Sequence, residues 1–517
     1  MREALPRVKW AVIDGLPFSL LQKYLDADRM PHLARLMQAG AITPLEPLWP
    51  NCQTPPSLFS IWSGQPATEH QIWGFDTPDG TEAGIFRNGF TRWPAALEMV
   101  WETWARAGHD VRLNHIPFVN EAKLGDRLVA RSSIYGETFY DSQVFHQSTR
   151  LTIGEHGLSL TLQWSDDEQA LIHVDGDGVK FTGKLSLDVF SDIPLPAPLE
   201  GTLTLMVTLT EGGGLQGALL GKNRYYRSGR EPALTGHPVG KDFCHASLAK
   251  QYRSGQLGTK KGLGGNGNAE KMLFASLERV HQSFYQELAE SFARQDAILT
   301  VGYYPVIDLA LHEILNIEKL AQSDSEVAAY FSQVLLWAEE VVATLEGSCR
   351  EGERLVINSD HGMQPVCDTF YLNHYLALHG WLTFTADGEI DYANTRAAYH
   401  PAENGTLLIR DESEVEQICE RICAFFTDAG RFGTKVVRLP VASRQQAFTT
   451  RFFLLPPDGV RVKASASAIA IGRSDKAGDH CGYSTLADLK GTLISTHGAI
   501  RPEIMQMYNI KSFIIED

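Results

Sequence analysis

The 517-residue sequence has no long apolar run. Its first residues, Met1 to Arg7, contain no hydrophobic segment of the kind that directs export, and no later stretch is apolar enough to span a bilayer. These absences exclude a cleavable signal peptide and a membrane anchor from the interpretation. We therefore expect a cytoplasmic protein with no membrane partner.

Cysteine is also scarce. The seven cysteines are odd in number and scattered along the chain, which favours reduced thiols over a disulfide framework. Cys419 and Cys423 lie four residues apart, but no second pair accompanies them. That spacing is more typical of a packed helix than of a zinc knuckle.

Positive charge is in deficit, with 46 Lys and Arg against 62 Asp and Glu and a net charge of −16. An acidic surface repels nucleic acid and anionic membranes, so we expect no nucleic-acid duplex as a partner. The charge of a phosphorylated substrate must then be met locally, by metal ions or a few basic residues. A hydrophobic content of 44% predicts a globular chain, with several domains or one large core carrying insertions.

The stretch Leu355 to Met363 combines an apolar strand with an Asp360-His361-Gly362 end. Open α/β sheets bind ligands outside the carboxyl ends of their strands. A carboxylate and an imidazole together suit a divalent ion such as zinc, and Gly362 permits the turn that would bring both to one point. Taken alone, the pair is more typical of a capped loop than of a metal site.

A second acidic residue, Asp14, follows the apolar strand Val8 to Ile13, where it suits either a turn cap or a metal ligand. Farther along, Pro55 and Pro56 predict the first turn of a helix, with Thr54 near its N-cap. Unpaired N–H groups at a helix start stabilise an approaching anion. Thr54 is therefore either an ordinary cap or an activated nucleophile.

Four segments stand in a characteristic order: Asp14-Gly15, Met30 to Ala41, Pro50 to Ser57 and Gly64 to His70. This set resembles the opening of the type I phosphodiesterase/nucleotide pyrophosphatase family, of the alkaline phosphatase superfamily. The resemblance implies an α/β fold whose mostly parallel central sheet is flanked by helices. It also implies that Asp14 is a metal ligand and that Thr54 is a nucleophile bridging two metals.

The apolar strand Ala297 to Tyr304 leads to Asp308 and His312. Four residues apart, they share one face of a helical turn, so both side chains can hold one ion. The spacing is similar to the family's Asp-x-x-x-His motif. The other interpretation is an ion pair on a helix surface.

The last ligand of the family stands in a His-Gly-Tyr-like loop. His480 is the better match, although Cys481 interrupts the motif, and His497 is the alternative. The resemblance then implies one ion on Asp14, Asp360 and His361, a second on Asp308, His312 and His480, and Thr54 between them. Zinc suits these mixed nitrogen and oxygen ligands, and manganese or iron would also fit.

Between these motifs the sequence changes character. Alternating apolar and polar residues from about 153 to 210 predict an antiparallel β-rich insertion. We expect a catalytic core at 1–120 and 269–517, a cap-like insertion at 121–268, and a smaller elaboration near 370–467. The Gly-rich segment 260–268 favours a flexible linker over a phosphate cradle. His374, His379 and His400 are interpreted as structural.

Together these features predict a metal-dependent hydrolase of a small phosphorylated substrate. Related diesterases place an Asn soon after a His-Gly-Ile-like segment, where this sequence has Phe75. That departure leaves diesters, monoesters, pyrophosphates and phosphonates open. A sulfatase is disfavoured because Cys52 is not followed by the Pro and Arg of Cys-x-Pro-x-Arg. The alternative from another class is a non-catalytic protein that binds a phosphorylated ligand through metal.

Overall fold

A computed structural model shows the chain. It describes all residues except 1–5, 79–83, 92, 135–136, 154, 166–168, 198, 200, 211–212, 232–236, 244–246, 400–405, 440–447, 449, 466–468, 481, 483–485, 497–504 and 517. His400, Cys481 and the alternative ligand His497 therefore lie outside the described residues.

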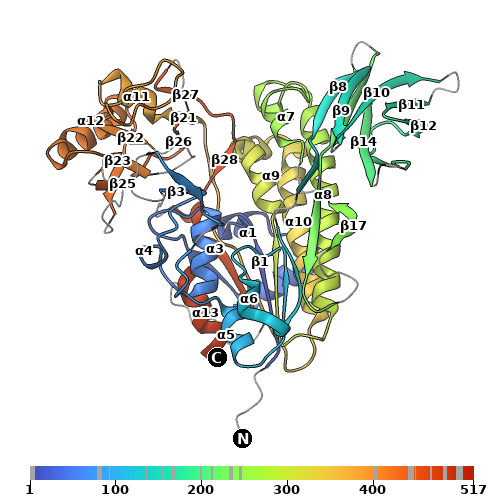
Figure 1. Cartoon of the computed structure of the whole chain (residues 1–517), viewed down its shortest axis with the longest axis horizontal. Helices are drawn as coiled ribbons and strands as arrows, with labels where there is room; N and C mark the ends of the chain where they lie inside the picture. The colour runs from blue at the N-terminus through green and yellow to red at the C-terminus, as the bar shows by residue number, and fades with distance from the viewer. Residues whose placement is uncertain are drawn as a thin grey trace, which may run out of the picture.

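The molecule is built around one large sheet, which occupies the middle of the molecule in Figure 1. Its central strands are parallel and stand in the order β6 (Leu128–Ser132), β5 (Val111–Asn114), β18 (Leu299–Tyr304), β1 (Val8–Ile13) and β19 (Arg354–Asn358). Beyond β19 the sheet continues through β29 (Gly491–Ser495), β2 (Ile42–Glu46) and β30 (Met505–Gln506). Beyond β6 it continues through β16 (Lys222–Ser228) and β17 (His237–Phe243), and β7 (Glu137–Tyr140) pairs with β16. β29 runs antiparallel to both of its neighbours.

Helices cover both faces of this sheet. One face carries α8 (Asn268–Ala293), α9 (Val306–Ile314) and α10 (Ser325–Ser348), with α1 (Phe18–Tyr24) and α2 (Pro31–Gln38) beside α10. The other face carries α3 (Thr54–Ser63), α5 (Val100–Arg106) and α13 (Ile510–Glu516). Strand β1 shows why both faces need cover: Ala11 and Ile13 join the first core, whereas Trp10 and Val12 join the second.

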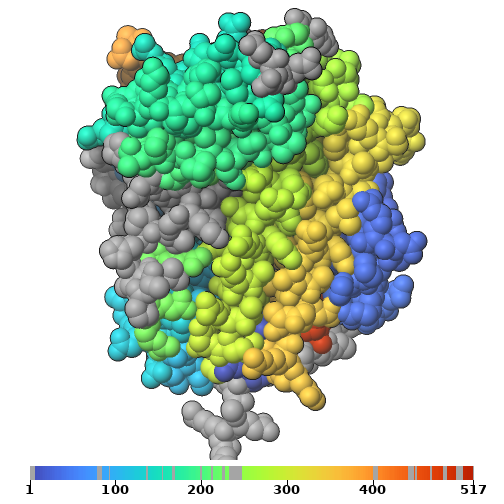
Figure 2. Space-filling view, turned by 90° about the vertical axis from the view of Figure 1, so that its right-hand side faces the viewer, coloured from blue at the N-terminus to red at the C-terminus, as the bar shows by residue number. Residues whose placement is uncertain are grey.

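A β-rich insertion stands at one end of the molecule, above α8 and α10 in Figure 2. It contains two four-stranded antiparallel sheets around a core of their own. The first has the order β12 (Val179–Leu185), β11 (Ala170–Gly176), β10 (His156–Trp164) and β9 (Ser148–Ile153). The second has the order β13 (Ser191–Pro194), β14 (Thr202–Leu209), β15 (Leu215–Leu220) and β8 (Gln143–His146).

A second outgrowth, orange in Figure 1, stands on the opposite side and also has its own core. It contains α11 (Leu372–Leu378), α12 (Val415–Asp428) and two small sheets. The first sheet has the order β22 (Ala397–Tyr399), β23 (Thr406–Ile409), β25 (Thr450–Leu455) and β24 (Lys435–Arg438). The second has the order β26 (Val460–Lys463), β21 (Asp368–Tyr371) and β27 (Ile471–Arg473).

The predicted fold class is confirmed: a mostly parallel central sheet is flanked by helices and carries a β-rich insertion. One local expectation differs. The Gly-rich segment forms defined turns around the short 3-10 helix Lys261–Leu263, and the Lys261 N–H donates to Glu270. No helix in the described part of the chain is long and apolar enough to cross a membrane.

Candidate metal centre

Three neighbouring parallel strands end at the same edge of the sheet and deliver the acidic residues there. Asp14 follows β1, Asp308 lies in the first turn of α9 after β18, and Asp360 follows β19. The pairing of β1 with both β18 and β19 brings the three carboxylates to one place. This is the edge where parallel α/β sheets bind ligands.

Asp14, Asp360 and His361 form the first group. Each offers a ligand atom within 4.8 Å of the others, and all three side chains are buried. His361 Nε2 lies 3.2 Å from Asp14 Oδ1 and 3.3 Å from Asp360 Oδ2. Its Nδ1 lies 3.0 Å from the Gly362 carbonyl, to which an Nδ1–H can donate. That bond leaves Nε2 turned toward the two carboxylates.

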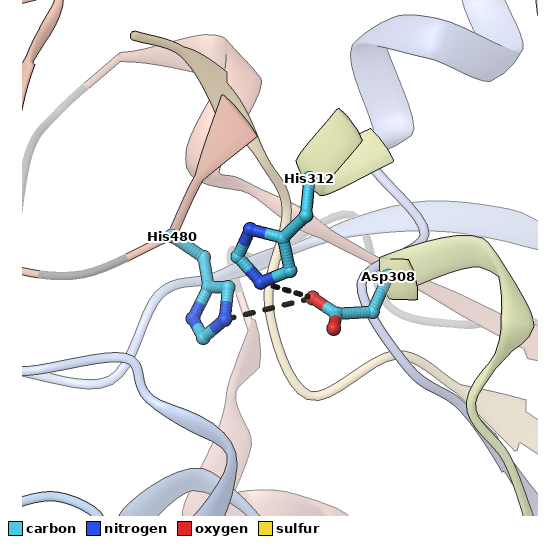
Figure 3. Close-up of side chains that lie close together, drawn as sticks. All are labelled: Asp308, His312 and His480. Carbon is cyan, nitrogen blue, oxygen red and sulfur yellow. Dashed lines mark ion pairs between the residues drawn. The ribbon is translucent and has the colours of Figure 1, made fainter. Parts of the chain in front are cut away.

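Asp308, His312 and His480 form the second group, shown in Figure 3. Asp308 Oδ1 lies 3.3 Å from His312 Nε2 and 3.5 Å from His480 Nε2. His312 Nδ1 is 2.7 Å from the Gly478 carbonyl at β28 (Gly478–Asp479). Burial lowers the pKa of both imidazoles well below its usual value, so both rings are neutral and able to ligate a cation.

The two groups are neighbours, and Thr54 lies beside them. The rings of His361 and His480, one from each group, stack with centroids 3.6 Å apart and planes 8° apart. Thr54 Oγ1 lies 3.4 Å from His361 Nε2. Thr54 is the first residue of α3, directly after the N-cap residue Gln53, so it lies near the cap as predicted. The structure thus brings together all seven side chains singled out in the sequence.

Three carboxylates buried at one point repel each other. Burial, followed by the charge of Asp14, raises the pKa of Asp308 and of Asp360 well above its usual value. Burial alone would lower the pKa of His361, but its contact with Asp14 and the charge of Asp308 raise it. Among the described residues, Asp14 Oδ1, Asp308 Oδ1 and Asp360 Oδ2 are buried and accept no hydrogen bond. Such oxygens fit a cation, which would relieve both the repulsion and the missing bonds.

Glycines hold the carboxylates at close quarters. Gly15 has φ +64°, and a Cβ there would lie 2.8 Å from the Cβ of Asp308. The predicted reason for Gly362 was conformational freedom, but Gly362 is absent from the positive-φ glycines that the structure describes. A Cβ at Gly362 would lie 2.1 Å from the Asp488 carbonyl. Close approach of backbone, and not backbone angle, therefore requires glycine at this turn.

Sequence reasoning missed three residues that contact the site. The Tyr303 hydroxyl donates to Asp14 Oδ2. Asn51 accepts from the Gly482 N–H at 3.2 Å, and the Cys52 thiol contacts the His480 carbonyl. Tyr303 was detectable in principle, as one of the two tyrosines that end the strand before Asp308. The contacts of Asn51 and Cys52 join segments more than 400 residues apart, and no local pattern reports such a contact.

A carboxylate–imidazole centre at the carboxyl edge of a parallel sheet, with a hydroxyl at a helix start, is the arrangement of a hydrolytic α/β enzyme. The chain matches the description "Type I phosphodiesterase / nucleotide pyrophosphatase" over residues 11–182 and 222–453, and it belongs to that family, within the alkaline phosphatase superfamily. The family is metal-dependent. The chain is accordingly a hydrolase acting on phosphate esters or phosphoanhydrides.

Solved structures with a similar course of the chain include murine ectonucleotide pyrophosphatase/phosphodiesterase 5 in complex with AMP. Its identity is 11%, its TM-score is 0.49, and 99% of this chain and 94% of that one are covered. Phosphonoacetate hydrolase from Sinorhizobium meliloti, in complex with phosphonoformate, has 12% identity and a TM-score of 0.47 over 99% and 95% of the chains. No curated protein sequence matches the chain.

Proposed function

We propose that Thr54 is the nucleophile of a phosphodiesterase or nucleotide pyrophosphatase reaction, next to two divalent metal ions. Asp14, Asp360 and His361 would hold one ion, and Asp308, His312 and His480 the other. The observation that carries the proposal is the position of the Thr54 hydroxyl beside two groups of buried metal-ligating side chains. The substrate is a small phosphorylated molecule.

The residues present fit such ions. Each group offers three protein ligands, the number typical of catalytic zinc. Carbonyls next to Nδ1 of His312 and His361 favour the tautomer whose Nε2 is free to coordinate. Mixed imidazole and carboxylate ligands favour zinc and also admit manganese or iron. Two bound ions would polarise the Thr54 hydroxyl and offset the charge of the phosphoryl group.

The chain's own residues then perform a two-step transfer. Thr54 Oγ1 loses its proton and bonds to phosphorus, while the bond from phosphorus to the leaving oxygen breaks and that oxygen takes up a proton. Water next splits the phosphothreonine, returning the threonine hydroxyl and releasing phosphate or a phosphate monoester. Pro55 and Pro56 carry no N–H, so the start of α3 would stabilise the anion at each step mainly through the positive end of the helix dipole.

The test pairs elemental analysis of the purified protein with turnover of bis(p-nitrophenyl) phosphate. We expect close to two metal ions per chain, turnover that EDTA abolishes, and no turnover by Thr54→Ala. Thr54→Ser keeps a hydroxyl and should retain part of the activity. Thr406→Ala is the control, because Thr406 is also a buried threonine but lies in the second outgrowth. Undiminished turnover by Thr54→Ala would contradict the proposal.

A second candidate is hydrolysis of monoesters or phosphonates at the same site. Phe75 motivates it, because its side chain offers no amide to a phosphoryl oxygen, where related diesterases have an Asn, and its N–H donates to Gln53 Oε1 at 3.1 Å. A panel of p-nitrophenyl phosphate, bis(p-nitrophenyl) phosphate and phosphonoacetate separates the two. Higher kcat/KM for the monoester or the phosphonate would replace the diesterase assignment. Metal-dependent binding without turnover of any compound would instead support a non-catalytic binder.

We further propose the division of the chain into a core at 1–120 and 269–517, an insertion at 121–268 and an elaboration near 370–467, although β6, β7, β16 and β17 from the range of the insertion join the central sheet. The separate apolar cores of the two outgrowths support it. Helix α9 carries Asp308 and His312, and strand β28 directly precedes His480. Both elements lie between the two outgrowths in Figure 1. Exchange or deletion of the insertion should change substrate preference more than metal content.

A further inference from the structure

His480 differs from the other two histidines of the candidate centre. His312 and His361 each have a carbonyl beside Nδ1, at 2.7 and 3.0 Å. His480 Nδ1 is buried and has no hydrogen-bond partner among the described residues. A ligating histidine is normally oriented by a bond to its second ring nitrogen. The direction of the His480 ring must therefore be set in another way.

Its main chain is held instead. The Cys52 thiol contacts the His480 carbonyl and lies 3.1 Å from the Gly482 carbonyl. Cys52 is fully buried, and its Sγ faces two carbonyl oxygens, which can only accept hydrogen bonds, so the thiol is the donor.

Asn51, the residue before Cys52, holds the main chain of Gly482 as well. Its Oδ1 accepts from the Gly482 N–H at 3.2 Å, and its Nδ2 donates to the Trp73 carbonyl at 2.6 Å. An N–H on one side and a carbonyl on the other fix which way the amide points. Asn51 is also buried, so water does not compete for these bonds.

We propose that Asn51 and Cys52 are positioning residues that fasten the main chain of His480 and Gly482 to the start of α3. They directly precede Gln53 and Thr54, so one short segment sets both the nucleophile and the main chain of His480. The consequence is a fixed separation between Thr54 and the Asp308 group. This inference rests on the proposed two-metal function, because its effect is exerted on the second metal position.

The test is a titration of the metal-free protein with zinc, in which calorimetry measures the affinity of each zinc equivalent. Cys52→Ala removes the donor and should weaken one of the two zinc equivalents by about 10- to 100-fold, leaving the other unchanged. Cys52→Ser keeps a donor and should recover most of the loss. Asn51→Asp places a carboxylate against the Trp73 carbonyl and should weaken the same equivalent.

Cys349→Ala is the matched control. Cys349 is a partly buried thiol 3.4 Å from the Leu345 carbonyl, outside the candidate centre, and its loss should leave both equivalents unchanged. Equal weakening of both equivalents by Cys52→Ala, or of neither, would overturn the inference. So would a loss of the same size in Cys52→Ser.

A crystal structure of metal-free Cys52→Ala makes the inference testable apart from the proposed function. We expect His480 Nε2 to leave its position 3.5 Å from Asp308 Oδ1, while His312 stays at 3.3 Å. An unmoved His480 would refute the positioning role. Wild-type protein that takes up fewer than two ions, with His480 displaced in the variant, would refute the two-metal function but support the positioning role.

Discussion

At the scale of single residues, the candidate centre depends on how each ligand is oriented by a neighbour. Tyr303 and Tyr304 are consecutive on β18 and therefore point to opposite faces of the sheet. The Tyr303 hydroxyl donates to Asp14 Oδ2, which leaves Asp14 Oδ1 facing His361. The Tyr304 hydroxyl lies 2.7 Å from Nδ1 of the buried His281, away from the carboxylates.

Tyr303→Phe should therefore weaken metal binding by about 10- to 100-fold, because Asp14 loses the bond that orients it. Tyr304→Phe is the matched control and should lower stability without changing metal affinity. Competition with a chromophoric zinc chelator measures both variants. Equal zinc affinities of Tyr303→Phe and wild type would show that the tyrosine does not orient the ligand.

The candidate ligands could be singled out from the sequence, whereas most of their neighbours could not. Asp360 and His361 end an apolar strand, and Asp308 and His312 have helical spacing, so local pattern is enough to single them out. The predicted roles of these residues stay predictions. His480 needed the family resemblance, because its partners come from distant segments. Tyr303 and Cys52 act through contacts that only the folded chain makes.

At the scale of elements, the junction of β1 with α9 fixes the distance between the first and second groups. The Asp308 N–H donates to the Asp14 carbonyl at 3.2 Å, and Gly15 follows directly. An alanine Cβ at Gly15 would lie 2.8 Å from the Cβ and 2.9 Å from the Cα of Asp308. Either β1 or α9 must move to accept it.

We expect Gly15→Ala to displace Asp308 and to abolish most metal binding and turnover. Gly40→Ala is the control: Gly40 has a similar φ of +68°, but nothing lies within 4 Å of its Cβ position. The free energy of unfolding of Gly40→Ala should therefore fall only by the cost of placing an alanine in the left-handed conformation, about 1 kcal/mol. Similar activities of the two variants would mean that backbone strain, and not crowding of Asp308, explains the effect of Gly15→Ala.

A buried histidine connects α3 with α4 (Ala67–His70). The Ile72 N–H donates to His70 Nδ1 at 3.1 Å, and His70 Nε2 lies 2.9 Å from Ser60 Oγ. Burial lowers the pKa of His70 from 6.5 to about 3. The unfolded chain thus binds a proton below pH 6.5 that the folded chain refuses, so stability falls as the pH drops toward 3.

Between pH 7 and pH 5 this one group should reduce the free energy of unfolding by about 2 kcal/mol. His70→Asn keeps an acceptor for the Ile72 N–H but does not titrate, so it should lack that part of the pH dependence. Urea unfolding of wild type and variant at both pH values measures it. The same change at the exposed His146 is the control. An unchanged pH dependence in His70→Asn would contradict the assignment.

The elements were predicted best where they are fully buried. β1 and β19 are short apolar runs because helices cover both of their faces, and their predicted ranges agree with the structure to within a residue. The arrangement of the second outgrowth depends on pairings between distant strands, such as β21 with β26. Those pairings leave no local signal.

At the scale of the whole molecule, an acidic chain concentrates three carboxylates at one buried point. Among the described residues, Asp14, Asp308 and Asp360 each have a buried oxygen without a hydrogen bond. Without a cation the folded state must therefore bear their mutual repulsion and desolvation. Metal binding and global stability are then coupled, because ions bind the folded protein and not the dispersed residues of the unfolded chain.

Added zinc and the loss of one carboxylate should each relieve this repulsion. Zinc at 1,000 times its Kd should stabilise the wild type by about 4 kcal/mol for each site that it fills, and EDTA should remove this gain. Asp360→Asn removes one buried charge while an oxygen remains to accept the Gly15 N–H, which lies 3.2 Å away. Because burial and Asp14 raise the pKa of Asp360, the metal-free wild type loses stability as the pH rises above 3.8, and the variant escapes this loss.

Metal-free Asp360→Asn should therefore unfold at a higher temperature than metal-free wild type at pH 7, yet gain little from zinc. Scanning calorimetry with EDTA and with zinc, on both proteins, gives the four unfolding temperatures. Asp488→Asn, which removes a carboxylate that is not part of either ligand group, controls for the change in net charge. A variant less stable than wild type without metal would show that the carboxylates are not under the repulsion that the two-metal proposal requires.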